Sequence, residues 1–113
     1  MLAKQYRLQK DKDLKLVFKN GKAFSAGFLF LKLKKNNLQV SRFGFIVGKR
    51  ISKKAAIRNK IKRRLREIIR KNLDNIKSEF DIVIWVKPVI ADKNYQEIEQ
   101  DIKELLKKSR LIK

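Results

Sequence analysis

The chain has 113 residues, of which 43% are hydrophobic, and it carries a net charge of +20 from 31 Lys and Arg against 11 Asp and Glu. This length suits one domain with a single core, and no composition shift or linker rich in Gly, Ser or Pro suggests a second domain. The sequence contains no Cys and no His. Their absence excludes disulfides, thiolate zinc sites and cysteine nucleophiles, and it removes the commonest general base.

The sequence predicts a soluble, cytoplasmic protein with no membrane partner. Its first residues lack the apolar segment of a signal peptide, which is roughly 7 to 15 residues long. The longest apolar runs, near residues 43–48 and 82–86, are far too short to span a bilayer.

The positive charge is concentrated in the first two thirds of the chain. Residues 1–48 hold 11 basic and 2 acidic residues, and residues 49–71 hold 12 basic residues and only Glu67. Residues 72–113 hold 8 residues of each sign and are neutral. This localisation favours a docking surface for a polyanion over a generally cationic composition.

The first half of the chain predicts one helix and two or three strands. Residues 11–20 predict a short helix, because acidic residues open the segment, apolar residues follow at helical spacing and Gly21 stands where a C-terminal cap belongs. A short additional strand is expected near residues 22–26. Residues 28–35 and the segment that follows to residue 48 predict two strands joined by a two-residue turn at Asn36-Asn37, a pair that tolerates positive φ.

The second half predicts two helices around one strand. Ser52 is the predicted cap of a helix over residues 52–76, whose apolar positions step by three and four: Ile57, Ile61, Leu65, Ile68, Ile69, Leu73 and Ile76. Residues 80–87 predict a strand with both faces covered, because the run is almost continuously apolar, and Pro88 ends it. The apolar spacing from Tyr95 to Leu106 predicts a last helix.

The 52–76 helix would leave seven basic side chains facing solvent: Lys53, Lys54, Arg58, Lys60, Lys62, Arg63 and Arg66. Like charges at i, i+4 destabilise a helix by roughly 0.2 to 0.5 kcal/mol per pair, so folding alone does not account for them. A phosphate backbone does, because it relieves the repulsion and releases counterions on binding. A merely solvated basic face is the alternative. Asn59 on the same face is either a solvated polar residue or a hydrogen-bonding group for RNA.

Two stretches carry a resemblance to a known family. The segment VGKRISKKAAIRNKIKRRLREIIR, residues 47–70, resembles the signature of the bacterial ribonuclease P protein subunit, and YRLQKDKDLKLVFKNGK, residues 6–22, resembles the N-terminus of that family. Two positions depart from the family pattern. Lys60 stands where a second Arg is usual, which keeps the charge but loses bidentate phosphate geometry, and Leu14 stands where a Phe is common.

The resemblance implies a fold of the α+β class. This would be a single-domain α/β sandwich over residues 1–113 with the order α-β-β-β-α-β-α, like the second domain of ribosomal protein S5. It would contain an unusual left-handed β-α-β crossover around the basic helix, whereas sequence pattern alone favours the right-handed connection.

The resemblance also implies a non-catalytic role within a ribonucleoprotein endonuclease. The protein would bind a catalytic RNA, help that RNA to hold Mg²⁺, and contact the 5′ leader of precursor tRNA during its removal. No catalytic side chain, no protein metal ligand and no DNA partner are expected, and Asp11 and Asp13 are assigned to charge compensation at a helix N-terminus. The expected RNA-binding residues are Lys49, Arg50, Lys53, Lys54, Arg58, Asn59, Lys60, Lys62, Arg63 and Arg66.

A second surface is predicted on the strands. If Asn36-Asn37 forms a two-residue turn, one sheet face carries the alternating aromatic and basic residues Phe28, Phe30, Lys32, Lys34, Phe43 and Phe45. Aromatic rings beside lysines suit single-stranded RNA, although a core role is preferred for Phe43 and Phe45. The resemblance assigns leader contacts to Phe18, Phe30 and Lys32. A structural ribosomal or ribosome-assembly protein that binds rRNA is the alternative function, and the missing His counts against a protein-only nuclease.

Overall fold

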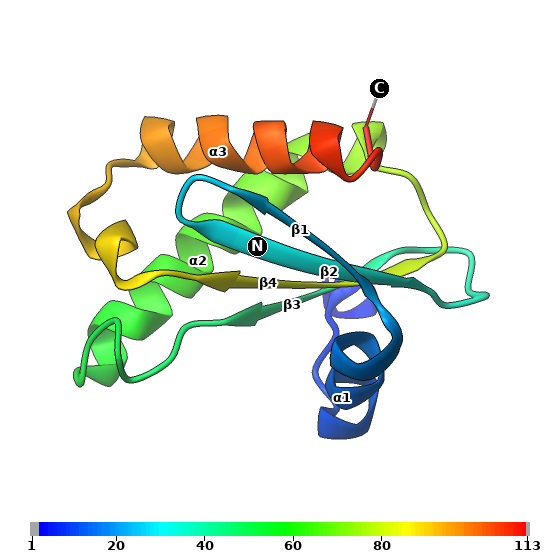
Figure 1. Ribbon diagram of the computed structural model, residues 1–113, viewed down its shortest axis with the longest axis horizontal. Helices are drawn as coiled ribbons and strands as arrows, with labels where there is room; N and C mark the ends of the chain where they lie inside the picture. The colour runs from blue at the N-terminus through cyan, green and yellow to red at the C-terminus, as the bar shows by residue number, and fades with distance from the viewer. Residues whose placement is uncertain (1–2, 113) are drawn as a thin grey trace.

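The computed structural model describes residues 3–112 as a four-stranded sheet with helices on both faces (Figure 1). In the described chain the helices are α1 (Asp11–Asn20), α2 (Ala55–Asn72) and α3 (Tyr95–Lys108), and the strands are β1 (Lys22–Ala26), β2 (Leu29–Lys35), β3 (Arg42–Ile46) and β4 (Phe80–Val86). Short 3-10 turns cover Lys4–Tyr6, Leu73–Asn75 and Pro88–Asp92. The predicted order α-β-β-β-α-β-α is confirmed, including the additional strand β1.

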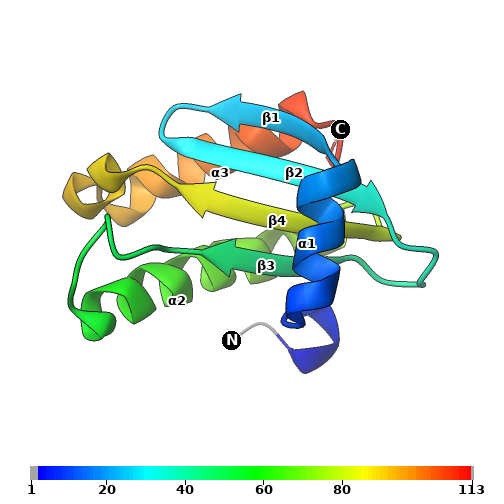
Figure 2. The same ribbon diagram turned by 60° about the horizontal axis from the view of Figure 1, so that its bottom comes forward.

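The strands lie in the order β1-β2-β4-β3, and only the β3–β4 pair is parallel. Helix α2 connects these two parallel strands. Figure 2, seen from the side of α1, shows both strands running in the same direction, with β4 above β3 and α2 behind the sheet. This arrangement makes the β3–α2–β4 crossover left-handed, as the resemblance implied and against the usual preference.

The predicted hairpin between β2 and β3 is wrong. Strand β4 lies between them and pairs with both. Asn37 does adopt a positive φ of 61°. It stands, however, in a longer connection, residues 36–41, which joins two strands that are not neighbours in the sheet. The Asn36 amide donates to the Val40 carbonyl at 3.1 Å, and the Asn36 backbone N–H donates to the Glu79 carbonyl at 2.9 Å. These bonds tie the connection to the start of β4 and leave β3 free to pair on the far side of it.

The insertion of β4 changes which phenylalanines share a face. Phe43 pairs in register with Ile82, and Ile82 with Leu33. Phe43 and Phe45 therefore lie on the face of the sheet that carries Leu29, Leu31 and Leu33 of β2, the leucine face, and not beside Phe30. The core role preferred for Phe43 is confirmed, because only 2% of its surface is exposed. Phe28, at the β1–β2 turn, is buried in the same core and is likewise separated from Phe30.

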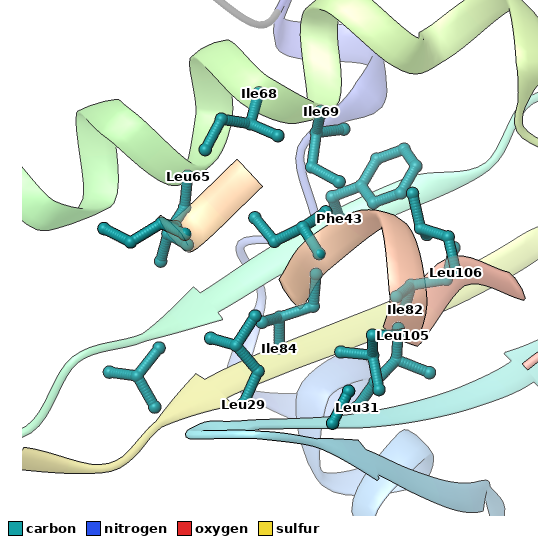
Figure 3. Close-up of a cluster of buried hydrophobic side chains, with 14 of the residues drawn as sticks. Leu29, Leu31, Phe43, Leu65, Ile68, Ile69, Ile82, Ile84, Leu105 and Leu106 are labelled. Atoms are coloured by element: carbon teal, nitrogen blue, oxygen red, sulfur yellow. The ribbon is translucent and has the colours of Figure 1, made fainter. Parts of the chain in front are cut away.

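Helices α2 and α3 cover the leucine face (Figures 1 and 3). The core between them and the sheet combines residues from all four described strands and both helices. It includes Ala26, Leu29, Leu31, Phe43, Leu65, Ile68, Ile69, Ile82, Ile84, Leu105 and Leu106. Most of these side chains have no exposed surface. This core therefore fixes the orientation of α2, and with it the direction in which the basic side chains of α2 point.

Helix α1 crosses the opposite face of the sheet (Figure 2). Its Val17 is fully buried against Leu8 and Val83. Gly21 ends the helix as predicted, but with an extended φ of −81°. A glycine is needed there because a Cβ would lie 2.5 Å from the Val17 carbonyl oxygen and 2.9 Å from that of Leu33.

An ion-pair network holds α1 and the β2–β3 connection to the same face. The Arg42 guanidinium donates to both carboxylate oxygens of Asp81, at 2.8 and 2.7 Å, and the Asn36 amide donates to one of them at 2.9 Å. Asp13 of α1 lies 3.5 Å from Arg42. The hydrogen bonds to the buried Asp81 raise the pKa of Arg42 above its usual value.

The basic helix begins later than predicted. Helix α2 starts at Ala55 and its N-cap is Lys54, which makes no side-chain capping bond. The Ser52 hydroxyl instead accepts from the Lys54 N–H at 3.2 Å in the preceding turn. Ile57, expected in the apolar stripe, is 39% exposed.

No helix among residues 3–112 has both the length and the apolar character needed to cross a membrane.

Candidate nucleic-acid interface

The predicted RNA-binding residues form a continuous basic region over α2 and the loop before it. Lys49, Arg50, Lys53 and Lys54 are exposed in that loop. On the helix itself the exposed members are Asn59, Lys60 and Arg63, and the half-buried members are Arg58, Lys62 and Arg66. The structure thus brings all ten residues to the surface, although three of them also make contacts within the protein.

Arg58 has a structural contact that the sequence did not predict. Its Nη1 donates to the Ser52 carbonyl at 2.9 Å. This bond ties the first turn of α2 to the basic loop, and the remaining N–H groups of the guanidinium stay available for a phosphate. Arg58 therefore both positions Lys53 and Lys54 and contributes charge.

Arg66 lies where positive charges converge. Burial, and then the charge of Arg7, lower the pKa of Arg66 below its usual value. Arg7, Lys62 and Arg66 line a crevice of about 250 Å³ between α2, the N-terminal segment and β3. The N-terminal segment is held there by the Leu8 N–H, which donates to the Phe43 carbonyl at 2.8 Å. An anion in this crevice would reduce the repulsion between the two arginines.

The residues predicted to contact a leader also lie together, around a residue that the sequence analysis missed. The Trp85 ring lies 5.2 Å from that of Phe30, nearly parallel at 15°, and 5.3 Å from that of Phe18, tilted by 51°. Lys32 donates to the Phe18 carbonyl at 2.7 Å and stands 5.6 Å from the centre of its ring. On the other side, the Lys87 ammonium lies 4.9 Å from the centre of the Phe30 ring.

This aromatic cluster, Phe18, Phe30 and Trp85, lies on the sheet face that α1 covers at one end only (Figure 2). The register places Phe30, Trp85 and Ile46 side by side across β2, β4 and β3. Trp85 and Phe30 are half-buried, and Ile46 is 36% exposed. The rings therefore form an open platform flanked by two lysines, which suits stacking of unpaired bases.

Carboxylates do not assemble into a metal site in the described part of the chain. No three His, Cys, Asp or Glu residues within 3–112 lie close enough to hold a metal ion. Asp11 and Asp13 stand in the first turn of α1 as expected, and Asp13 is engaged by Arg42.

The fold and these two surfaces define a small, basic α+β domain with a basic helix on one side and an aromatic platform on the other. Comparison with known proteins specifies the family. The family model described as Ribonuclease P matches residues 2–110. The chain belongs to the ribonuclease P protein family, whose members are the protein component of the enzyme that processes the 5′ end of tRNA.

Relatives cover almost the whole chain. The ribonuclease P protein component of a Pseudanabaena species is 37% identical over 99% of this chain and 97% of its own length. That of Syntrophomonas wolfei is 37% identical over 98% of this chain and 92% of its own length. Solved structures agree in fold. A mutant of the Staphylococcus aureus RNase P protein has a TM-score of 0.89 and 25% sequence identity, and the match covers 96% of this chain and 92% of that one. The Thermotoga maritima RNase P protein has a TM-score of 0.83 and 33% sequence identity, and the match covers 89% of this chain and 97% of that one.

Proposed function

We propose that this protein binds the catalytic RNA of ribonuclease P through α2 and its preceding loop, and holds the single-stranded 5′ leader of precursor tRNA on the aromatic cluster. The observation that carries the proposal is the Phe18–Trp85–Phe30 platform between Lys32 and Lys87. Unpaired bases stack on such rings, and lysines beside them attract the phosphates. A protein that only stabilised folded rRNA would not require an open platform of this kind.

The two RNA partners are supported by the separation of the two surfaces. Helix α2 lies behind the sheet in Figure 2, and α1 lies in front of the sheet. The aromatic cluster is on the same face as α1, because Phe18 and Trp85 pack with Val17 of that helix. One protein molecule can therefore contact a structured RNA and an unpaired strand at the same time. Holding both would raise the effective concentration of the leader at the catalytic RNA, and we expect this to tighten substrate binding without any catalytic side chain.

Magnesium enters this proposal through the RNA. The described residues offer no carboxylate cluster for the ion, so phosphate oxygens of the catalytic RNA would hold it. Basic side chains at Lys49, Arg50, Lys53 and Lys54 would lower the repulsion between RNA strands at low Mg²⁺ concentration. We expect the protein to reduce the Mg²⁺ concentration that the RNA requires.

Reconstitution tests this function. RNA-free protein should leave precursor tRNA intact, and cleavage at low Mg²⁺ should appear only when the cognate catalytic RNA is added. Trp85 is the single tryptophan of the chain and stands within the platform. Precursor tRNA should therefore quench its fluorescence in the reconstituted complex, whereas mature tRNA should not. Leader removal by the protein alone would contradict the proposal, and so would equal quenching by both tRNAs.

A further inference from the structure

The two lysines beside the aromatic cluster are held in different ways. Lys87, directly after β4, is exposed, and its ammonium lies 4.9 Å from the centre of the Phe30 ring. Lys32, in the middle of β2, is half-buried, and its ammonium donates to the Phe18 carbonyl at 2.7 Å. Lys87 therefore presents its charge to solvent, whereas the ammonium of Lys32 is directed at the backbone of α1.

The Phe18 carbonyl needs a donor because it lies in the last turn of α1. The Gly21 N–H closes the helical pattern by donating to the Val17 carbonyl at 2.7 Å. The next residue, Lys22, already belongs to β1, so the helix supplies no N–H to the Phe18 carbonyl. The Lys32 ammonium takes this place, and its charge lies at the negative end of the helix dipole. Lys32 is thus a C-terminal cap that reaches α1 from the sheet.

Helix α1 has few other contacts that fix it on the sheet. Val17 is its buried residue, in a cluster with two other buried side chains. At the N-terminal end of the helix, Asp13 lies 3.5 Å from Arg42. The last turn, which carries Phe18, is fixed from the sheet by the bond from Lys32. We expect this turn to shift when that bond is removed.

The position of the last turn determines where the Phe18 ring lies. This ring stands 5.3 Å from the Trp85 ring, and the Lys32 ammonium stands 5.6 Å from the centre of the Phe18 ring. Lys32 thus contacts both the carbonyl and the ring of one residue. Because aromatic pairs interact only over a narrow range of separations, a shift of the last turn would weaken the Phe18–Trp85 contact and loosen one end of the platform.

We propose that Lys32 is a positioning residue for the leader: it caps α1, holds Phe18 against Trp85, and makes no phosphate contact of its own. This inference rests on the proposed function, since it assumes that the platform holds an unpaired strand. It changes the role that the sequence analysis gave to Lys32, which was a direct contact with the leader. Of the two lysines, Lys87 is then the one that contacts a phosphate.

Fluorescence of the free protein tests the positioning directly. Lys32→Met keeps most of the apolar side chain and removes the ammonium. Trp85 is the single tryptophan, so its emission reports the contact with Phe18. The emission should move to longer wavelength, and acrylamide should quench it more strongly, because the indole becomes more exposed. Lys34→Met is the matched control, since it makes the same change two residues along the same face of β2, and it should alter neither signal.

Salt dependence separates positioning from phosphate contact. In the reconstituted complex, Lys32→Met should lower the affinity for precursor tRNA about five- to ten-fold, as expected for loss of one hydrogen bond to a charged group, and should leave mature tRNA unaffected. The slope of log K against log salt should stay as in the unaltered protein, because no phosphate contact is lost. Lys87→Met should make that slope shallower by up to about 0.7, the value for one contact on a single strand.

A double-mutant cycle tests whether Lys32 acts through Phe18. Phe18→Leu removes the ring that Lys32 positions. The double variant should therefore bind precursor tRNA as weakly as Phe18→Leu alone, so that the two losses do not add.

The possible results distinguish this inference from the proposed function. A shallower slope for Lys32→Met, or losses that add in the double variant, would overturn the positioning role, because Lys32 would then act on the leader without Phe18. Normal precursor affinity in Lys32→Met beside weak binding in Phe18→Leu would overturn it as well. In each of these cases the proposed function stands. If Phe18→Leu and Phe30→Leu both bind precursor tRNA normally, the platform does not hold the leader, and both proposals fail.

Discussion

Replacing Phe30 by leucine should separate substrate recognition from packing on the sheet face. Phe30 is half-buried and contacts the Trp85 ring at 5.2 Å and the Lys87 ammonium at 4.9 Å. Leucine retains most of the apolar volume, so the folded state loses mainly these ring contacts. Each is worth roughly 0.5 to 1.5 kcal/mol. We expect the free energy of unfolding to fall by about 1 to 2 kcal/mol, and the melting temperature by roughly 4 °C per kcal/mol.

The effect on RNA should be larger and confined to substrates with a leader. One stacked base contributes roughly 1 to 3 kcal/mol, which corresponds to a loss of about 5- to 150-fold in affinity. Fluorescence anisotropy of labelled precursor and mature tRNA, measured on the reconstituted complex, gives the two affinities. Only the precursor should bind more weakly.

Phe24→Leu is the matched control for this experiment. Phe24 is also half-buried, but its register partner is Leu31, so it lies on the opposite face of the sheet. It should lower stability without changing either affinity. If Phe30→Leu weakens precursor and mature tRNA equally, or if Phe24→Leu has the same effect on the precursor, Phe30 does not contact the leader.

Three further outcomes follow from named contacts. Lys62→Ala and Arg66→Ala should each make log K for the catalytic RNA against log salt shallower by up to about 0.9, measured by filter binding at several salt concentrations; unchanged slopes would exclude the crevice side of α2 as a docking site. Arg42→Met should lower the free energy of unfolding in urea by roughly 3 to 5 kcal/mol, because it leaves the buried Asp81 carboxylate without its counter-ion; a loss below about 1 kcal/mol would contradict this. Asn94→Ala removes the capping box of α3 and should cost about 1 kcal/mol in the same assay, with RNA affinity unchanged.

Local patterns in the sequence predicted most elements, whereas the order of strands in the sheet was not accessible to them. Helix α1 has the predicted bounds, and strand β4 ends one residue before the predicted position. The Asn36-Asn37 signal was also correct locally, since Asn37 has a positive φ. A tight hairpin and a longer connection share that local signal. The choice between them depends on β4, which is more than 40 residues away in the chain and competes for the same edge of β2.

Residues of the candidate site were missed for a related reason. Trp85 was assigned to a strand with both faces covered, yet α1 covers only one end of its face (Figure 2). The alternation of β4 carried the missing signal, because Trp85 and Val83 share one face while Ile82 and Ile84 occupy the other.

The left-handed crossover determines whether the aromatic cluster is open at all. With the same parallel pair β3–β4, a right-handed connection would place α2 on the face that carries Phe30, Lys32 and Trp85. The apolar side of α2 would then cover these rings, and its basic side chains would lie next to α1. In the observed connection α2 packs on the leucine face, and within residues 3–112 the other face is covered at one end by α1 and Leu8 (Figure 2). The uncommon handedness therefore provides what the proposed function needs, which is one surface for a structured RNA and a separate open surface for an unpaired strand.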